Sequence, residues 1–524
     1  MEIDYSLFVD HERAELIQRV SLVMPLADVL LSKRILSYEA YSEIHTEKTS
    51  QAQMRALYRF LDSGGRTAKT AFYHALMKEN PFLIEELERT FRNGETSHNR
   101  QESRETRASV EGEGPQNLET KWHKSSKRWQ KYLTDLLKDS DRRSVGNGKL
   151  LLCTKNNKYK IGTGADGTIV YLGIKADGTE VAIKRMVKAN NEQLKNEISH
   201  LRLLESVYIV RYVDFVEDED FNYLALQLCE CDLEEYRKKL GKEKGEEDKM
   251  KVLKKLAREV LLGLQVVHDA GGIHRDIKPQ NVLIDVEGKA RLADFGISRR
   301  LDGGESTRCT SRAGTEGWEA AEILENEDEE KCRYNKETDI QVAGMLLHYI
   351  LSDGHHPFGK HAFRMASIAK GEYSLHETIE KDVEAKDLIE GMLPKDPEKR
   401  LKIEEAVEHP YFWDDERRDA FLRKVGDKEA VQKFRSVDEK LCNAVAKYTD
   451  GRSFSEWKSK ISKVPQIKAP DKNLPDDLLG LLRYLRNLLV HNKKAFEDNN
   501  MFKDLFPDFF ISAHKLAKEM CWNA

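Results

Sequence analysis

Apolar residues recur at helical spacing through the first 92 residues of the 524-residue chain. They stand three or four positions apart, which is the spacing of one face of an α-helix. Proline and glycine interrupt the pattern, so we expect roughly five or six short helices in a compact all-α bundle over residues 1–92. One apolar face contains Leu16, Ile17, Val20 and Val23, and the expected breaks are Pro25, Gly64-Gly65 and Pro81.

The pattern changes twice between residues 93 and 150. Residues 93–120 are polar and charged with almost no large apolar side chain, which predicts a flexible linker. Residues 121–143 then place Trp122 and Trp129 among eight Lys and Arg and three Asp residues. This stretch is either a basic aromatic helix that contacts RNA or a membrane, or a helix packed on the next domain. Packed helices are the more common case, and we expect one here.

Alternating apolar residues around a glycine-rich stretch predict two strands of a hairpin near the start of the third region, residues 151–413. The pattern is G-x-G-x-x-G-x-x-V, which on its own is found in many turns. Glycines at this spacing allow the backbone to approach phosphate groups closely. The residues expected to cover a nucleotide are Ile161, Gly162, Gly164, Gly167 and Val170.

Two further stretches are expected to line the nucleotide site. In Val181–Lys184 the lysine would hold the α and β phosphates, and it needs a carboxylate from a following helical run to orient it. An apolar stretch over residues 223–229 resembles the strand that leads to the hinge of a protein kinase, where backbone groups would bind adenine. The residues assigned to these contacts are Ala182, Lys184, the carboxylate Glu197, and Gln227 and Cys229 of the hinge.

The stretch Gly272–Gly296 holds residues suited to phosphoryl transfer. That reaction needs positioned metal ions, a carboxylate beside the incoming hydroxyl and a cation on the phosphates. We expect Asp276 to orient the hydroxyl and Lys278 to neutralise charge on the transferred group. Asn281 and Asp294 supply two oxygen ligands for Mg²⁺.

These residues form two ordered motifs. His274-Arg275-Asp276 with Asn281, followed by Asp294-Phe295-Gly296, resembles the catalytic and metal loops of protein kinases. The resemblance spans residues 151–413. It implies an α+β bilobal protein kinase fold that uses ATP and Mg²⁺.

The end of the activation segment departs from the kinase pattern at one position. Ala321 stands where kinases usually have the proline of Ala-Pro-Glu. We expect Glu322 still to pair with Arg400, and Asp339 to anchor the backbone of the catalytic loop. The missing proline would reduce rigidity more than chemistry.

Several short stretches of the N-terminal segment match a second family. They are Phe8–His11, Leu16–Val20, Leu36–Tyr41, Met54–Tyr58, Ala75–Leu76 and Pro81–Glu88. Together they resemble a caspase-recruitment domain (CARD) of the inflammasome-adaptor kind. The resemblance implies a six-helix death-fold bundle that binds other CARD-containing signalling proteins through charged patches. The charged candidates are acidic Asp10, Asp28, Glu85 and Glu86 and basic Arg13, Arg19, Lys33 and Arg34.

Three stretches point to one kinase family, namely Gly314–Trp318, Gly354–Gly359 and His409–Trp413. They resemble the inositol-requiring kinase/endoribonuclease of the unfolded-protein response and its relative ribonuclease L. The resemblance implies self-association through the kinase and nuclease domains, and an all-α kinase-extension nuclease (KEN) domain over residues 414–524. The tail has a helical pattern, and its clearest apolar stripe is Leu478, Leu481, Leu482, Leu485 and Leu489.

The nuclease motif of that family matches Arg486, Asn487 and His491. Cleaving RNA through its own 2′-hydroxyl needs proton transfer at both oxygens and a cation on the phosphate, but no metal. Histidine suits the proton transfer, Arg486 can clamp the phosphate with two donors, and Asn487 can position it. The family's nuclease tyrosine lies fourteen residues before the motif Asn, and that position is Asn473 here. The second proton-transfer group is therefore missing or replaced.

Composition limits these assignments. Charged residues make up 34% of the chain and apolar residues 40%, and 86 Lys and Arg against 91 Asp and Glu give a net charge of −5. That balance is no global nucleic-acid signature, so RNA contacts must be local. The seven Cys lack C-x-x-C spacing, which argues against a zinc site and fits a reducing compartment. Neither a signal-peptide core nor an apolar run long enough for a membrane span is visible, so we expect a cytoplasmic protein.

We therefore expect a cytoplasmic serine/threonine protein kinase and endoribonuclease that binds ATP and acts in stress or innate-immune and cell-death signalling. Self-association through the N-terminal CARD would activate it. The alternative is a scaffold that binds ATP and recruits CARD partners without cutting RNA. The intact kinase positions favour the enzyme, whereas Ala321 and Asn473 favour the scaffold.

Overall fold

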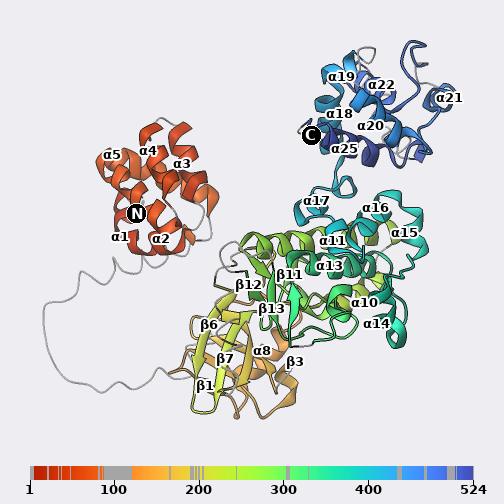
Figure 1. Ribbon diagram of the computed structural model, residues 1–524. Coiled ribbons are helices and arrows are strands. Elements are labelled where there is room, and N and C mark those ends of the chain that lie inside the picture. Colours follow the sequence, from red (N-terminus) through yellow and green to blue (C-terminus); the bar gives the residue numbers. More distant parts are fainter. Residues whose placement is uncertain are drawn as a thin grey trace, which may run out of the picture. The chain divides into compact units, whose positions relative to one another are not determined.

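A computed structural model describes most of the chain, which forms two compact units, Met1–Gly112 and Glu113–Ala524 (Figure 1). No helix in the described part of the chain is both long enough and apolar enough to cross a membrane. The described residues are 5–20, 23–32, 35–36, 38–47, 49–80, 83–84, 87, 121–164, 167–188, 194, 197–198, 201–202, 204, 206–243, 245–301, 307–328, 330–433, 439–464, 469–491, 502 and 504–522.

The N-terminal unit is a bundle of helices around one apolar core. The longest helix, α5, contacts each of the four helices that precede it. Thr49 caps α5, because its Oγ1 accepts a hydrogen bond from the N–H of Ala52 at 3.2 Å. The core includes Phe8, Leu16, Leu30, Leu57 and Phe72, all fully buried. The helices are α1 Tyr5–His11, α2 Arg13–Arg19, α3 Val23–Ser32, α4 Tyr38–Thr46 and α5 Ser50–Glu79.

Two of the breaks expected in this bundle are wrong. Pro25 lies in the first turn of α3, where N–H groups have no partner within the helix and a missing one costs nothing. Helix α5 continues through Gly64-Gly65, because glycine costs only about 1 kcal/mol in a helix interior and the flanking turns are packed in the core. Pro81 and most of the expected last helix, and the charged candidates Lys33, Arg34, Glu85 and Glu86, lie outside the described residues.

The second unit starts with an antiparallel sheet of seven strands, the N-terminal lobe. The strand order is β1-β2-β4-β5-β7-β6, and β3 pairs with β4. Helix α8 Gln130–Lys138 buries Leu133, Leu136 and Leu137 against this lobe. The strands are β1 Arg143–Val145, β2 Leu150–Leu152, β3 Lys160–Thr163, β4 Ile169–Lys175, β5 Glu180–Val187, β6 Tyr212–Glu217 and β7 Phe221–Gln227, with a short helix η1 at Asn157–Tyr159.

The next lobe is mainly helical and holds the largest core of the molecule. Its central helix, α13, is buried along nearly its whole length and starts with a reciprocal cap between Asn335 and Thr338. The helices are α10 Leu233–Glu243, α11 Glu246–Asp269, α12 Ala321–Leu324, α13 Lys336–Leu351, α14 His361–Lys370, α15 Glu377–Lys381, α16 Val383–Met392 and α17 Ile403–Val407, with η3 Pro279–Asn281, η4 Pro397–Lys399 and η5 Pro410–Phe412. The short strands are β8 Cys231–Asp232, β9 Gly272–Ile273, β10 Val282–Ile284, β11 Ala290–Leu292, β12 Arg299–Arg300, β13 Arg308–Thr310 and β14 Cys332–Tyr334.

The C-terminal region is helical and has its own core, which includes Trp457 and Phe509. Gly480 of α22 is needed for close packing, because a Cβ there would lie 1.9 Å from the carbonyl oxygen of Pro475. The region joins the helical lobe beside α17, and Lys518 pairs with Glu405 of that helix (Figure 1). Its helices are α18 Asp415–Gly426, α19 Glu429–Gln432, α20 Glu439–Thr449, α21 Trp457–Ser462, α22 Leu478–His491 and α25 Phe509–Glu519.

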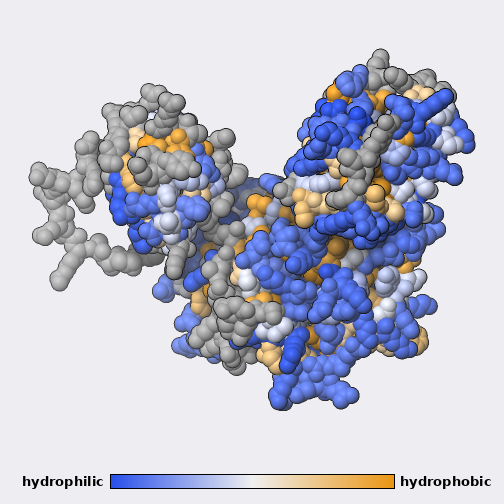
Figure 2. Space-filling view, turned by 45° about the horizontal axis from the view of Figure 1, so that its top comes forward, coloured by the Kyte–Doolittle hydropathy of each residue, from blue (hydrophilic) through white to orange (hydrophobic). Residues whose placement is uncertain are grey.

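The face of the molecule shown in Figure 2 is mostly hydrophilic, with scattered hydrophobic areas between the charged side chains. The most exposed large apolar side chain among the described residues is Phe363 of α14, at 71%. Isolated apolar side chains of this kind are ordinary on protein surfaces.

Candidate functional site

Lys184 of β5 is held in a buried ion-pair network between the lobes. Its Nζ lies 2.9 and 2.8 Å from the two carboxylate oxygens of Glu197 and 2.9 Å from Oδ1 of Asp294. Burial acts to lower the pKa of Lys184, but the charges of Glu197 and Asp294 outweigh burial and raise that pKa above its ordinary value. Lys184 is therefore a fixed cation, and its expected pairing with Glu197 is confirmed.

Asp294 brings the second lobe into this network. Its φ of 63° lies in the left-handed region, which is costly for a residue other than glycine and is common at functional sites. Burial acts to raise the pKa of Asp294, but the charge of Lys184 outweighs it, so that pKa is lowered. The side chain is 44% exposed. An ionised carboxylate oxygen thus remains accessible to a cation.

Asp339 of α13 holds the backbone of the catalytic loop in place. Its carboxylate accepts hydrogen bonds from the backbone N–H groups of His274 at 2.8 Å and Arg275 at 2.9 Å. It also lies 2.9 Å from Nε2 of the buried His268. Arg275 has a φ of 72°, so these bonds hold a strained backbone in place. The anchoring role expected of Asp339 is confirmed.

Asp276 is held by three side chains. Its Oδ2 accepts from Nζ of Lys278 and from Nδ2 of Asn281, both at 2.7 Å. Its Oδ1 accepts from Oγ1 of Thr315 at 2.6 Å, and Lys278 also donates to Thr315 at 2.6 Å. We did not assign Thr315 to the site from the sequence, although it lies in a stretch used to recognise the family. The carboxylate of Asp276 is thereby fixed at the end of the activation segment.

The oxygen atoms of Asn281 and Asp294 fit as ligands of a magnesium ion. Asn281 uses its Nδ2 to hold Asp276, which leaves its amide oxygen as a ligand, and Asp294 supplies a carboxylate oxygen. Mg²⁺ prefers such oxygen ligands and completes its shell with water and substrate phosphates. In the described ranges, no three His, Cys, Asp or Glu side chains are grouped as they would be in an all-protein metal cage.

The glycine-rich stretch forms the hairpin of β3 and β4. Gly162 pairs with Val170, and the N–H of Gly164 donates to the carbonyl oxygen of Thr168 at 2.9 Å. Gly167 has a φ of 72°, which glycine adopts at no steric cost. Residues 165 and 166 lie outside the described part. The predicted hairpin is confirmed.

The segment between the lobes contains both hinge residues named from the sequence. Gln227 ends β7, and on the neighbouring strand Ala182 pairs with Leu226. Cys229 is 9% exposed, and its carbonyl oxygen accepts a hydrogen bond from Nε1 of Trp129 at 2.8 Å. No sequence pattern predicts this contact, because the two residues are 100 positions apart.

The end of the activation segment keeps its expected ion pair. Arg400 donates to the two oxygens of Glu322 at 2.9 and 2.6 Å. The N–H of Ala321, which a proline would lack, donates to Oε1 of Gln341 at 2.8 Å. This hydrogen bond gives a structural reason for Ala321 at that position.

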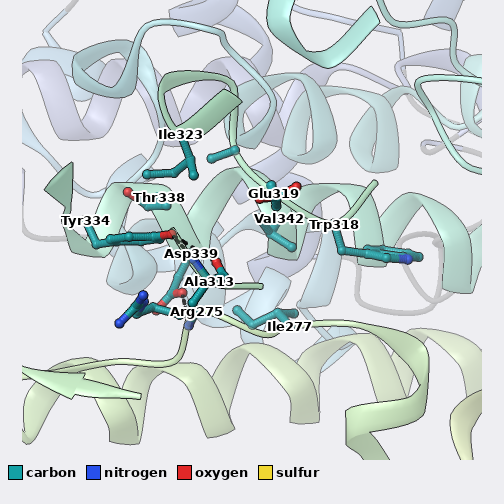
Figure 3. A pocket seen from close by; sticks show the side chains of 11 residues that line it. Arg275, Ile277, Ala313, Trp318, Glu319, Ile323, Tyr334, Thr338, Asp339 and Val342 are labelled. Atoms are coloured by element: carbon teal, nitrogen blue, oxygen red, sulfur yellow. Dashed lines mark hydrogen bonds between the residues drawn. The ribbon is translucent and has the colours of Figure 1, made fainter. Parts of the chain in front are cut away.

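A small buried cavity of about 10 Å³ lies between the activation segment and α13 (Figure 3). The guanidinium of Arg275 stacks over the ring of Tyr334, 4.1 Å from its centroid, and Nη2 donates to the carbonyl oxygen of Ser311 at 2.9 Å. Its Nε and Nη1 are buried and have no hydrogen-bond partner among the described residues. A buried cation with unused donors beside this segment is suited to receive a phosphate.

The three residues of the nuclease motif lie on α22. Arg486 donates from Nη1 to Oδ1 of the adjacent Asn487 at 3.1 Å, and its Nη2 lies 2.6 Å from Oδ1 of Asp427, the residue that follows α18. His491 is exposed in the last turn of α22, and Asn473 is exposed before that helix. Arg486 is therefore already paired with a carboxylate that was not predicted.

Family models match two parts of the chain. A protein kinase domain model matches residues 156–412, and a caspase recruitment domain model matches residues 7–90. The kinase match begins after α8, β1 and β2, covers the rest of both lobes and includes all the residues around Lys184 and Asp276 described above.

Relatives extend the similarity beyond the kinase domain. The chain is 31% identical over 380 residues to serine/threonine-protein kinase/endoribonuclease ire-1 of Caenorhabditis elegans, covering 67% of this chain and 36% of the relative. It is 33% identical over 377 residues to serine/threonine-protein kinase/endoribonuclease IRE2 of Homo sapiens, covering 68% and 39%. The sensor for unfolded proteins in the ER ire1 of Schizosaccharomyces pombe is 32% identical over 385 residues, covering 67% and 35%.

The chain thus spans little more than a third of the length of these relatives. Each match is longer than residues 156–412, so it includes residues outside the kinase domain. The chain therefore contains a caspase recruitment domain and a protein kinase domain, and it is a homologue of the serine/threonine-protein kinase/endoribonucleases.

Proposed function

We propose that this protein is a serine/threonine protein kinase and a metal-independent endoribonuclease that is activated when its CARD brings copies together. The observations that carry the kinase activity are two sets of contacts, one that joins Lys184 to Asp294 and one around Asp276. The first holds the phosphate-binding cation against a metal ligand from the second lobe, and the second fixes the hydroxyl-orienting carboxylate, as phosphoryl transfer requires.

In the proposed kinase reaction, Lys184 holds the α and β phosphates of ATP and Glu197 keeps its ammonium in place. Asp276 accepts a hydrogen bond from the substrate hydroxyl, and Lys278 neutralises charge on the moving phosphoryl group. Mg²⁺, held by Asn281 and Asp294, would supply charge neutralisation between the phosphates. Thr315 fixes both Asp276 and Lys278, so we add it to the site as a positioning residue.

The proposed nuclease lies in residues 414–524, which we assign to a KEN-type domain. His491 is exposed and can exchange protons with the RNA, while Arg486 and Asn487 face the phosphate. The pairing of Arg486 with Asp427 is compatible with this role, because the carboxylate of Asp427 is half-exposed, an ion pair open to water is worth about 1 kcal/mol, and a phosphate can displace the carboxylate. The relatives whose names include endoribonuclease support the proposal.

A second candidate function is an ATP-binding scaffold that recruits CARD partners without cutting RNA. Asn473 at the position of the family tyrosine favours it, and so does the carboxylate already bound to Arg486. Incubating the purified chain with a structured RNA, Mg²⁺ and an ATP analogue separates the two. Cleavage that leaves 2′,3′-cyclic phosphate ends supports the nuclease. RNA that stays intact at protein concentrations at which dimers form supports the scaffold function.

The cellular setting is part of the same proposal. A CARD coupled to a kinase homologue fits a cytoplasmic signalling protein whose partners are copies of itself, other CARD proteins and an RNA substrate. Stress, innate-immune or cell-death signalling is the setting in which such recruitment would be useful. Localisation of a tagged chain together with CARD pull-down tests this assignment.

A further inference from the structure

The segment just before the kinase domain is built into the N-terminal lobe. Residues 121–138, here called the hinge brace, comprise a mostly non-helical stretch followed by α8. Trp122, Leu133 and Leu136 share one buried cluster with Tyr159 and Leu172 of the lobe. Figure 1 shows α8 against the sheet. The packing expected for this segment is confirmed, and the brace is a part of the folded lobe.

The first half of the brace is fixed to the turn between β4 and β5. Glu180 accepts hydrogen bonds from Nε1 of Trp122 at 2.9 Å and from the N–H of Ser126 at 2.7 Å. Gly178 in that turn has a φ of 92°, and a Cβ there would lie 1.9 Å from the carbonyl oxygen of Lys121. The close approach and the buried carboxylate give the brace a defined path over the lobe.

The second half of the brace binds the hinge and reaches the helical lobe. Glu230 of the hinge accepts from the backbone N–H groups of Lys127 at 3.1 Å and Arg128 at 2.8 Å. The guanidinium of Arg128 donates to the carbonyl oxygen of Glu230 at 2.8 Å and to Glu235 of α10 at 2.6 Å. The brace therefore contacts the sheet lobe, the hinge and the helical lobe in succession.

Trp129 adds a contact to the hinge backbone itself. The peptide group between Cys229 and Glu230 is planar, so its carbonyl and its N–H are oriented together. The carbonyl oxygen accepts from Nε1 of Trp129 at 2.8 Å, and the N–H of Glu230 donates to the carbonyl oxygen of Ile284 at 2.7 Å. The plane is thus held from both sides, by the brace and by β10. Among the described residues, the N–H of Cys229 has no acceptor.

We propose that Trp129 is a positioning residue of the nucleotide site: by holding the Cys229–Glu230 peptide it restricts rotation about the backbone of Cys229, so that the N–H of Cys229, which belongs to the preceding peptide, stays available to an adenine ring. The inference rests on the proposed binding of ATP. It gives the hinge brace, which lies outside the kinase motifs, a role in nucleotide binding. A single buried hydrogen bond of this kind changes an equilibrium constant by up to about tenfold.

The test compares Trp129→Phe with Trp122→Phe in the full chain. Each change removes one indole N–H and keeps an aromatic ring in the same cluster, but only the indole N–H of Trp129 donates to the hinge. We expect Trp129→Phe to raise the Kd for ATP with Mg²⁺ by about 3- to 10-fold and the KM for ATP equally, with kcat nearly unchanged. Trp122→Phe should leave the Kd within about twofold, even if both variants lose similar thermal stability.

Glu230→Gln provides a second variant that leaves Trp129 in place and weakens the docking of the brace on the hinge. It should raise the Kd for ATP in the same direction by a smaller factor. Equal effects of Trp129→Phe and Trp122→Phe, or no effect of Trp129→Phe and Glu230→Gln on a chain that binds ATP, would overturn the inference. A wild-type chain that binds no ATP would instead overturn the proposed kinase function, and the role of Trp129 with it.

Discussion

The two candidate active sites are built in different ways. The kinase site joins side chains from β5, the catalytic loop and the activation segment, and buried contacts fix each of them. The nuclease motif lies on the single helix α22, where His491 is exposed and Arg486 and Asn487 are partly buried, and its arginine is held by the carboxylate that follows the neighbouring helix α18. A site closed within one chain can work alone, whereas an open set on one helix can contact only one side of an RNA. We therefore propose that the nuclease, but not the kinase, needs a second copy.

The largest expected effect is on the closed site. Asp276→Asn keeps the shape of the side chain but removes the proton acceptor, so autophosphorylation should fall by about 10²- to 10⁴-fold. Phosphate incorporation from labelled ATP measures it, and phosphates are expected among Thr307, Thr310 and Ser311, of which Ser311 contacts Arg275 through its carbonyl oxygen. The exposed Asp450→Asn is the matched control. A variant as active as the wild type would show that Asp276 takes no part in the transfer.

Removing the proton-transfer group of the nuclease motif should have an effect nearly as large as that of Asp276→Asn on the kinase site. His491→Ala is expected to lower cleavage of a structured RNA by about 10²- to 10⁴-fold while ATP binding stays intact. Gel analysis of RNA fragments measures it, with the exposed His361→Ala as control. Equal cleavage by His491→Ala and wild type would assign the activity to another residue or to a contaminant.

The sequence motifs predicted which side chains of the proposed kinase site lie together, because these motifs are local. Lys278 and Asn281 lie within six positions of Asp276, and both contact it. Thr315, Trp129 and Asp427 were missed, because their partners are 39, 100 and 59 positions away and no spacing rule links them. The bundle was predicted as helical, but the break at Gly64-Gly65 was wrong, because packing outweighed the low helix propensity of glycine.

The next largest expected effect tests whether RNA cleavage depends on a second copy of the chain. Removing residues 1–92 should lower RNA cleavage by at least about tenfold at low protein concentration and little at high concentration, because the CARD raises the local concentration of the catalytic part. A concentration series of both chains measures it. Fusing an unrelated inducible dimeriser to residues 121–524 should restore activity. Identical curves for the two chains would mean that the CARD serves to locate the protein and does not control the nuclease.

The contact between Asp427 and Arg486 allows a smaller effect at the open site. Asp427→Asn removes the charge that competes with RNA phosphate for Arg486, so the KM for RNA should fall by about threefold. Asp450→Asn again serves as control. An increase in KM would show that Asp427 orients Arg486 for the RNA and does not compete with it.

The smallest expected effect is on the pH dependence of stability. It comes from His348, a buried histidine of the helical lobe, in contrast to the exposed His491 of the nuclease motif. His348 lies 2.9 Å from the carbonyl oxygen of His355 through Nδ1, and its Nε2 accepts from the N–H of His376 at 2.9 Å. A proton on Nε2 would face that N–H group. The pKa of His348 is lowered from an ordinary value near 6.5 to about 4, and burial is the largest cause.

Because the folded chain binds this proton more weakly than the unfolded chain, stability is full above about pH 6.5 and is lost as the pH falls toward 4. The loss from this one group is about 2 kcal/mol at pH 5. Urea unfolding between pH 7 and 4.5 measures it. His348→Gln should be less stable at pH 7 but show a flatter dependence on pH, while the exposed His361→Gln should keep the wild-type slope. If His348→Gln keeps the full slope, the loss of stability in acid comes from other groups.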